Sequence, residues 1–157
     1  DFGIRPFGLE AQNTLRLEKA HVIIGQESEI RTNLHDLGLT RLWARQKTTA
    51  RKVGAPALRF SENQTGRLKL VGVELDENIP LPGDGSLIVD DRIRGYLCTI
   101  RKSVALGRTI GLALVEDHLA REGARLSIFT EKSNEPRLGA TVVNTPFYDP
   151  EGKRLRS

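Results

Sequence analysis

The first clear pattern along the chain is a helical one over residues 8–19, GLEAQNTLRLEK. Phe7, Ala11 and Leu15 recur at intervals of four, and good helix formers fill most positions between them. Pro6, just before this stretch, suits the start of a helix. The pattern predicts an amphipathic helix whose apolar stripe, formed by Phe7, Ala11 and Leu15, is buried.

The next stretch gives shorter signals of β type. The run HVII at 21–24 predicts a short strand that stops at Gly25, and a polar, turn-rich segment follows it. The sequence LTRLWARQ at 39–46 predicts a second strand, in which Arg41 and Trp43 lie on the same face because strand side chains alternate. Residues 47–66 are interpreted as a linker with one helical turn at 57–60.

From residue 68 onward, short runs rich in Leu, Val and Ile alternate with turn residues. Six such runs lie at 68–75, 86–89, 93–100, 109–115, 124–130 and 138–143. A short helix is expected at 117–122, ending at Gly123. Strands of this length and spacing predict an antiparallel barrel, and closure removes the exposed edges that an open sheet would leave. The fold class is therefore α+β, with a domain boundary near residue 66 and the barrel packed on the helix at 8–19.

Composition narrows the class of protein. With 157 residues, 38% of them hydrophobic and 28% charged, the chain suits one globular domain or a domain plus a fragment. No apolar run approaches the roughly 18 residues of a membrane span, so we expect no membrane association. Cys98 is the single cysteine, which excludes an internal disulfide and favours a reducing, cytoplasmic location. The chain contains no Met and starts with Asp, so we expect either a processed product or a piece of a longer polypeptide.

The charge is unevenly distributed. The formal net charge is +4, yet residues 37–61 contain no Asp or Glu and carry six cations, at 41, 45, 47, 51, 52 and 59. Such a basic strip is usually a solvated surface. It can also attract an acidic ligand, a partner protein or a nucleic acid, and the sequence leaves these alternatives open.

No catalytic signature is visible in the residues themselves. Gly83-Asp84-Gly85 is interpreted as a tight turn rather than a phosphate-binding loop, and Asp90-Asp91 as a hairpin turn. The three histidines show no metal-ligand spacing. Trp43 is the only tryptophan; packing is its default role, although a tryptophan among cations can stack on a planar ligand.

Several segments in the same order resemble one known family. RPFGLEAQNTLRLEKAHVIIGQ, at 5–26, resembles a segment of the glycine cleavage T-protein (aminomethyltransferase) superfamily. Its version with AQ, LRLEK and IIxGQ is most similar to the alpha subunit of heterotetrameric sarcosine oxidase. LGRTIGLALV, HLAREGARL and PFYDPEGKRL, at 106–115, 118–126 and 146–155, are similar to the closing barrel of that group.

The resemblance implies a tetrahydrofolate-dependent fold in three lobes that moves a one-carbon unit from a small amine donor onto folate. Residues 1–66 would be the C-terminal piece of the folate-binding domain and 67–157 the C-terminal β-barrel domain. In family members the catalytic acid and the Glu that holds the pterin lie upstream, so we expect no catalytic residue in this chain. The missing N-terminal part, or other subunits of an oxidase, would be its partners.

The resemblance also suggests four substrate-binding residues. Gln12 stands where many relatives have a folate-facing Arg, and Arg16, one turn later, could supply the missing charge. The family's aromatic residue near folate aligns with Arg41, and Trp43 lies two positions further on. Ala20 replaces a Gly of the relatives. We expect Gln12, Arg16, Arg41 and Trp43 to contact folate.

Two classes of function remain at this point. In the first, the chain is part of a folate-dependent one-carbon enzyme. In the second, it is a non-catalytic β-barrel interaction module that docks a partner subunit or nucleic acid through the basic strip. Nucleic acid is disfavoured because Trp43 and Phe60 are the only aromatic residues within that strip.

Overall fold

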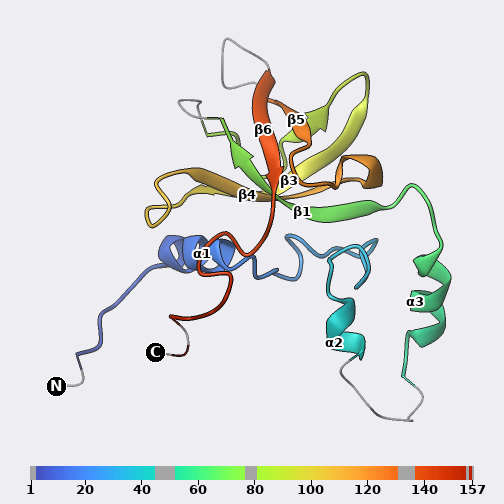
Figure 1. Ribbon diagram of the computed structural model, residues 1–157, viewed down its shortest axis with the longest axis horizontal. Helices are drawn as coiled ribbons and strands as arrows, with labels where there is room; N and C mark the ends of the chain where they lie inside the picture. The colour runs from blue at the N-terminus through green and yellow to red at the C-terminus, as the bar shows by residue number, and fades with distance from the viewer. Residues whose placement is uncertain (1–2, 45–51, 77–80, 131–136, 155, 157) are drawn as a thin grey trace.

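The computed structural model describes residues 3–44, 52–76, 81–130, 137–154 and 156. Three helices precede the sheet: α1 (Leu9–Glu18), α2 (Thr40–Ala44) and α3 (Ala55–Glu62). Six strands follow: β1 (Leu68–Leu75), β2 (Leu87–Val89), β3 (Ile93–Lys102), β4 (Thr109–Glu116), β5 (Arg125–Phe129) and β6 (Arg137–Val143). All three helices lie on one side of the strands (Figure 1).

The strands close into an antiparallel barrel in the order β1-β4-β3-β2-β5-β6, with β6 pairing back onto β1. This confirms the predicted six-stranded barrel. In β5, Leu126 and Ile128 are buried while Arg125 and Phe129 are exposed, as the alternating pattern predicts.

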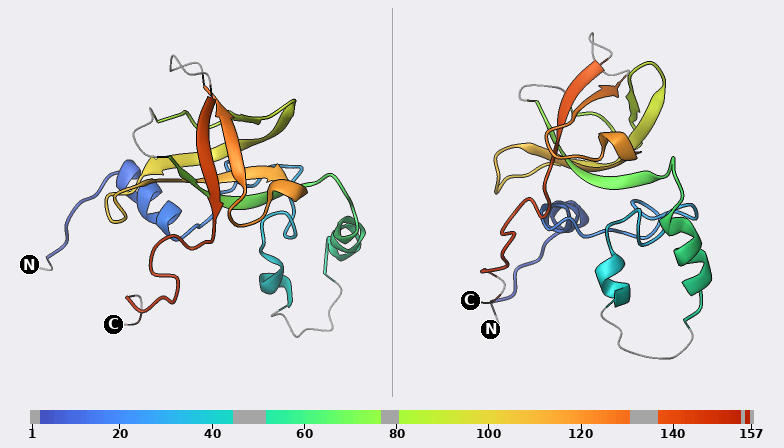
Figure 2. Two further views of the ribbon diagram at one scale, coloured as in Figure 1. Left: turned by 45° about the horizontal axis from the view of Figure 1, so that its top comes forward. Right: turned by 45° about the vertical axis from the view of Figure 1, so that its right-hand side comes forward.

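Strand β4 is buried on both of its faces. Ala113 and Val115 belong to the apolar core inside the barrel. Ile110 and Leu112 point to the outside, where they form a second cluster with Leu17 of α1. Helix α1 therefore packs on the outside of the barrel beside β3 and β4, as expected (Figure 2).

The predicted buried stripe of α1 is wrong. Phe7 and Leu15 are 70% and 58% exposed, and Ala11 is exposed as well. The helix instead buries Leu17 and Glu18, and the Ser103 hydroxyl donates a 2.6 Å hydrogen bond to the Glu18 carboxylate. Because this bond satisfies the carboxylate, the barrel can accept a face of α1 that includes a charged residue.

The strand expected at 21–24 does not form. Only one isolated bridge, between Ile24 and Ser28, has β geometry there. The Ile23 N–H donates to the Glu27 carboxylate at 2.7 Å instead of to a neighbouring strand. The barrel is closed, so its sheet has no edge onto which this segment could pair.

The strand expected at 39–46 is also wrong where it is described, because Thr40–Ala44 is the short helix α2. Residues two apart do not share a helical face, so Arg41 and Trp43 diverge. Residues 45 and 46 lie outside the described residues. The single turn expected at 57–60 is the longer helix α3, which starts after Gly54 in a left-handed conformation. The helix expected at 117–122 shrinks to a 3₁₀ turn at Asp117–Leu119.

Candidate functional site

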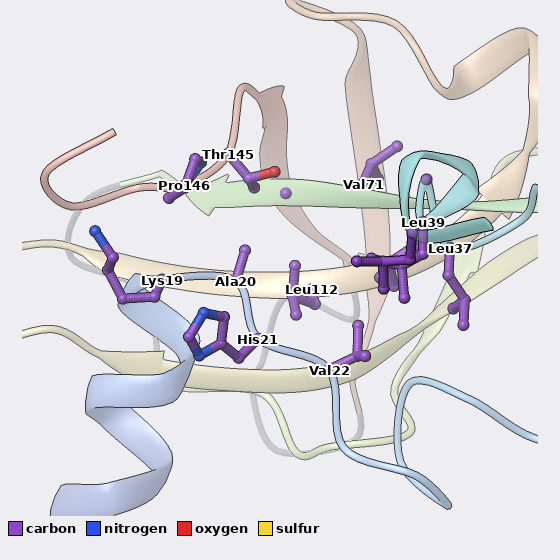
Figure 3. A pocket seen from close by; sticks show the side chains of 14 residues that line it. Lys19, Ala20, His21, Val22, Leu37, Leu39, Val71, Leu112, Thr145 and Pro146 are labelled. Carbon is purple, nitrogen blue, oxygen red and sulfur yellow. The ribbon is translucent and has the colours of Figure 1, made fainter. Parts of the chain in front are cut away.

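A partly open cavity of about 560 Å³ lies between the end of α1, strands β1 and β4, and the segment that leads into α2. We call it the barrel cavity. Most of its wall is apolar, with Leu37 and Leu39 at one end and Ala20 and Leu112 in the middle (Figure 3). An apolar cavity of this size suits the flat, weakly polar rings of a small ligand.

The other end of the barrel cavity carries Lys19, His21 and Thr145 (Figure 3). The Lys19 ammonium donates to the backbone oxygens of Tyr148 and Asp149, at 3.2 and 2.8 Å, and pairs with the Asp149 carboxylate at 3.4 Å. These contacts tie the C-terminal segment to α1. Lys19 is therefore already neutralised and does not supply a free positive charge to a ligand.

A second cavity of about 590 Å³ lies between the segment 28–37 and helix α3. We call it the α3 cavity; Leu37 lines both cavities, so they adjoin. Trp43 forms part of its wall, and the Lys52 ammonium lies 4.4 Å from the centre of the indole ring. A cation over one ring face stabilises the tryptophan in place.

Arg16 belongs to a buried polar cluster. Its guanidinium pairs with Glu27 at 2.7 Å, and it donates to the Thr99 hydroxyl at 2.7 Å and to the Gln26 amide oxygen at 3.0 Å. The Thr99 hydroxyl in turn donates to Glu27 at 2.7 Å. The Glu27 side chain is fully buried and that of Arg16 is 9% exposed. The cluster therefore joins α1, the segment 21–28 and strand β3 into one unit.

The pKa of Cys98 reflects this environment. Burial, and next the negative charge of Glu27, raise the pKa of the Cys98 thiol to about 12. The whole residue is only 5% exposed. It is therefore an inert core residue.

Asp36 anchors the segment before α2 to the start of the barrel. Its side chain is 2% exposed and receives hydrogen bonds from the Arg67 guanidinium, while its backbone oxygen accepts from Leu70 N–H at 2.8 Å. Burial by itself would raise the pKa of Asp36, but the hydrogen bonds from Arg67 and from Asn33 N–H outweigh it and lower that pKa.

The structure does not gather the four predicted site residues at one point. Gln12 is exposed on α1, whereas Arg41 is exposed and Trp43 half-buried on α2. The two helices lie apart from each other on the same side of the barrel (Figure 1). The contacts of Arg16 are within the protein: one terminal nitrogen pairs with Glu27 and the other donates to the Thr99 hydroxyl.

Sequence reasoning missed the buried polar contacts of α1, which are those of Arg16 with Glu27 and Thr99 and that of Glu18 with Ser103. Their spacing carries no periodic signal, since contacts between residues 72 to 85 positions apart are created only by the fold. Within the described ranges, no group of three His, Cys, Asp or Glu side chains could hold a metal ion. The described helices are all too short or too polar to cross a membrane.

Comparison with known proteins identifies a family. Residues 69–149 match the glycine cleavage T-protein C-terminal barrel domain. The chain is 32% identical over 152 residues to an aminomethyltransferase of Clostridium botulinum strain Okra, covering 96% of this chain and 40% of that protein. It is 36% identical over 151 residues to the aminomethyltransferase of Acidobacterium capsulatum, covering 94% and 38%.

Two further comparisons extend the picture. A trimethylamine-oxide aldolase of Ruegeria pomeroyi is 30% identical over 156 residues, which are 99% of this chain and 20% of that protein. The crystal structure of aminomethyltransferase T from Bartonella henselae superposes with a TM-score of 0.78 at 22% identity, covering 91% of this chain and 39% of that one. That likeness shows the fold. The chain spans about two fifths of the aminomethyltransferases it matches.

Proposed function

Because this chain belongs to the glycine cleavage T-protein family through its C-terminal barrel domain, we propose that it is part of a tetrahydrofolate-dependent enzyme of one-carbon transfer. In this proposal it supplies one wall of the folate site, at which a one-carbon unit passes from an amine donor to tetrahydrofolate. We assign it, as part of this proposal, to the subgroup of the alpha subunit of heterotetrameric sarcosine oxidase, on the strength of the sequence AQ, LRLEK and IIxGQ within 5–26. The catalytic acid is supplied from outside these residues.

The observation that carries the proposal is the pair of adjoining cavities beneath the barrel. Their volumes, about 560 and 590 Å³, and their largely apolar walls suit the flat rings of a folate. Both are only partly enclosed, which agrees with a chain that spans two fifths of its aminomethyltransferase relatives. A one-sided wall binds a ligand poorly by itself, because a tight site buries most of its ligand.

The predicted residues take different parts in this proposal. Trp43 offers an aromatic surface at the wall of the α3 cavity. Arg41 is exposed nearby on α2 and adds positive charge for the carboxylates of the glutamate tail. On α1, Gln12 is an exposed hydrogen-bonding group, while Arg16 holds the helix in position through Glu27.

The test compares the isolated chain with a longer polypeptide. In the longer protein, residues 1–157 are joined behind the preceding part of the Clostridium botulinum aminomethyltransferase. We expect calorimetry to show tetrahydrofolate binding by the longer protein and none at micromolar concentration by the isolated chain. If the ring of Trp43 stacks on folate, Trp43→Ala should weaken folate binding by the longer protein by about 1–3 kcal/mol. Arg41→Ala should weaken it less. Failure of the folded longer protein to bind folate would contradict the proposal.

A further inference from the structure

Lys52 contacts Trp43 at two points. Its ammonium lies over the indole ring, 4.4 Å from the ring centre, and donates a 3.2 Å hydrogen bond to the backbone oxygen of Trp43. The first contact holds the ring and the second holds the helix that carries it. Because one ammonium makes both contacts, the orientation of the ring is coupled to the position of α2.

Lys52 is itself placed by the turn that begins α3. Its backbone oxygen accepts a 3.2 Å hydrogen bond from Ala55 N–H. Gly54, within this turn, has a φ of +84°, a conformation that glycine adopts without strain. Helices α2 and α3 lie next to each other in all views (Figures 1 and 2). The side chain of Lys52 therefore joins the start of α3 to α2, beside the α3 cavity.

The indole of Trp43 borders two cavities. It lines the α3 cavity of about 590 Å³ and also a smaller pocket of about 250 Å³, which it shares with Leu34, Leu42 and Lys52. Of these two, Lys52 lines only the smaller one. The ring face under the ammonium is therefore turned toward the smaller pocket. A ligand in the α3 cavity would meet aromatic surface that the ammonium leaves open.

We propose that Lys52 is a positioning residue, which fixes the indole of Trp43 at the wall of the α3 cavity so that a flat ligand ring can stack on its open side. A ligand that stacks on a mobile side chain has to immobilise it first, and this cost weakens binding. A ring already held by a cation avoids most of that cost. The proposal rests on the proposed function in taking folate as the flat ligand.

Time-resolved fluorescence anisotropy of the isolated chain tests the fixation directly, because Trp43 is its only tryptophan. Lys52→Leu keeps an apolar side chain and removes the ammonium, whereas Lys52→Arg keeps a cation that can lie over the ring. We expect the part of the anisotropy that decays within about a nanosecond to roughly double in Lys52→Leu and to stay unchanged in Lys52→Arg. Lys102→Leu is the matched control, since Lys102 is an exposed lysine at the end of β3, and it should leave the decay unchanged.

Folate binding by the longer polypeptide described above shows whether Lys52 acts through the ring. We expect Lys52→Leu to weaken binding about two- to fivefold, which corresponds to the strength of a cation–π contact at an exposed site. Lys52→Arg should restore most of the affinity, and Lys102→Leu should leave it unchanged. In a protein that already carries Trp43→Ala, Lys52→Leu should weaken binding no further, because the ring that it positions is gone.

Unchanged anisotropy decay in Lys52→Leu would overturn the proposal. So would an equal loss of folate affinity with and without Trp43, because Lys52 would then contact the ligand directly rather than position the ring. Absence of folate binding by the longer protein alongside the expected change in anisotropy would support the fixation of Trp43 and count against the proposed function alone.

Discussion

The buried pair of Arg16 and Glu27 provides the sharpest test of how α1 is held on the barrel. Their side chains are 9% and 0% exposed, and the closest nitrogen and oxygen atoms are 2.7 Å apart. Replacing one partner of such a pair leaves the other charge buried without compensation. Arg16→Met keeps much of the length and the helix propensity of the side chain, so the change removes mainly the charge and its hydrogen bonds.

We expect Arg16→Met to lower the free energy of unfolding by about 3 kcal/mol, at the lower end of the range for breaking a buried pair. The lower end applies because the Thr99 hydroxyl and the Ile23 N–H still donate to Glu27, each at 2.7 Å. The loss would be measured by urea denaturation at neutral pH. Glu27→Met should lower the free energy of unfolding less when Arg16 is already replaced than it does in the otherwise unsubstituted protein, because the two residues interact directly.

Arg125→Met is the matched control, since Arg125 also pairs with a carboxylate, Asp76, but its side chain is 60% exposed. An exposed pair of this kind contributes at most about 1 kcal/mol. If Arg16→Met proves no more destabilising than Arg125→Met, then the cluster around Arg16 is not the closed, dry contact that its distances indicate. Additive losses in the double variant would refute the direct coupling.

Three further predictions concern single residues. Ala20 has a φ of +53°, a left-handed conformation that strains any residue with a Cβ atom. Ala20→Gly should therefore raise the free energy of unfolding, measured in urea melts, by about 0.5–1 kcal/mol, because relief of this strain exceeds the cost of a more flexible unfolded chain. Cys98 is buried and its thiol pKa is raised from 9.0 to about 12, so it should react with a disulfide reagent at pH 8 at least about tenfold more slowly in the folded protein than in urea. An equally fast reaction in both conditions would refute its burial. The pKa of Asp36 is lowered in the folded protein, so its contribution to stability is present above its unfolded pKa and lost as the pH falls through the lower folded value. Urea melts at pH 7 and pH 3 should therefore show a smaller acid-induced loss for Asp36→Asn than for the unsubstituted protein.

The sequence by itself determined the strands and the first helix. The six predicted runs agree with β1 to β6 to within two residues at each end, and α1 lies inside the predicted 8–19. These elements are set by neighbours along the chain: strand side chains alternate, and Gly or Pro marks the turns. Closure of the barrel was also predictable, because an open sheet would have left unprotected edges. The boundary near residue 66 stays a prediction.

The tertiary structure decided which faces are buried and which polar groups meet. The spacing of Phe7, Ala11 and Leu15 was visible, but a spacing does not say against which surface a helix packs, and here Leu17 faces the barrel. A run as short as Thr40–Ala44 suits a strand or a helix equally well, and it became helical because the closed sheet offers it no edge. Likewise, no local pattern showed that Glu27 and Thr99, distant in sequence, would bind the guanidinium of Arg16. The predicted contact of Arg16 with folate stays a prediction. Burial and long-range hydrogen bonds depend on surfaces that exist only once the chain has folded, so no local pattern encodes them.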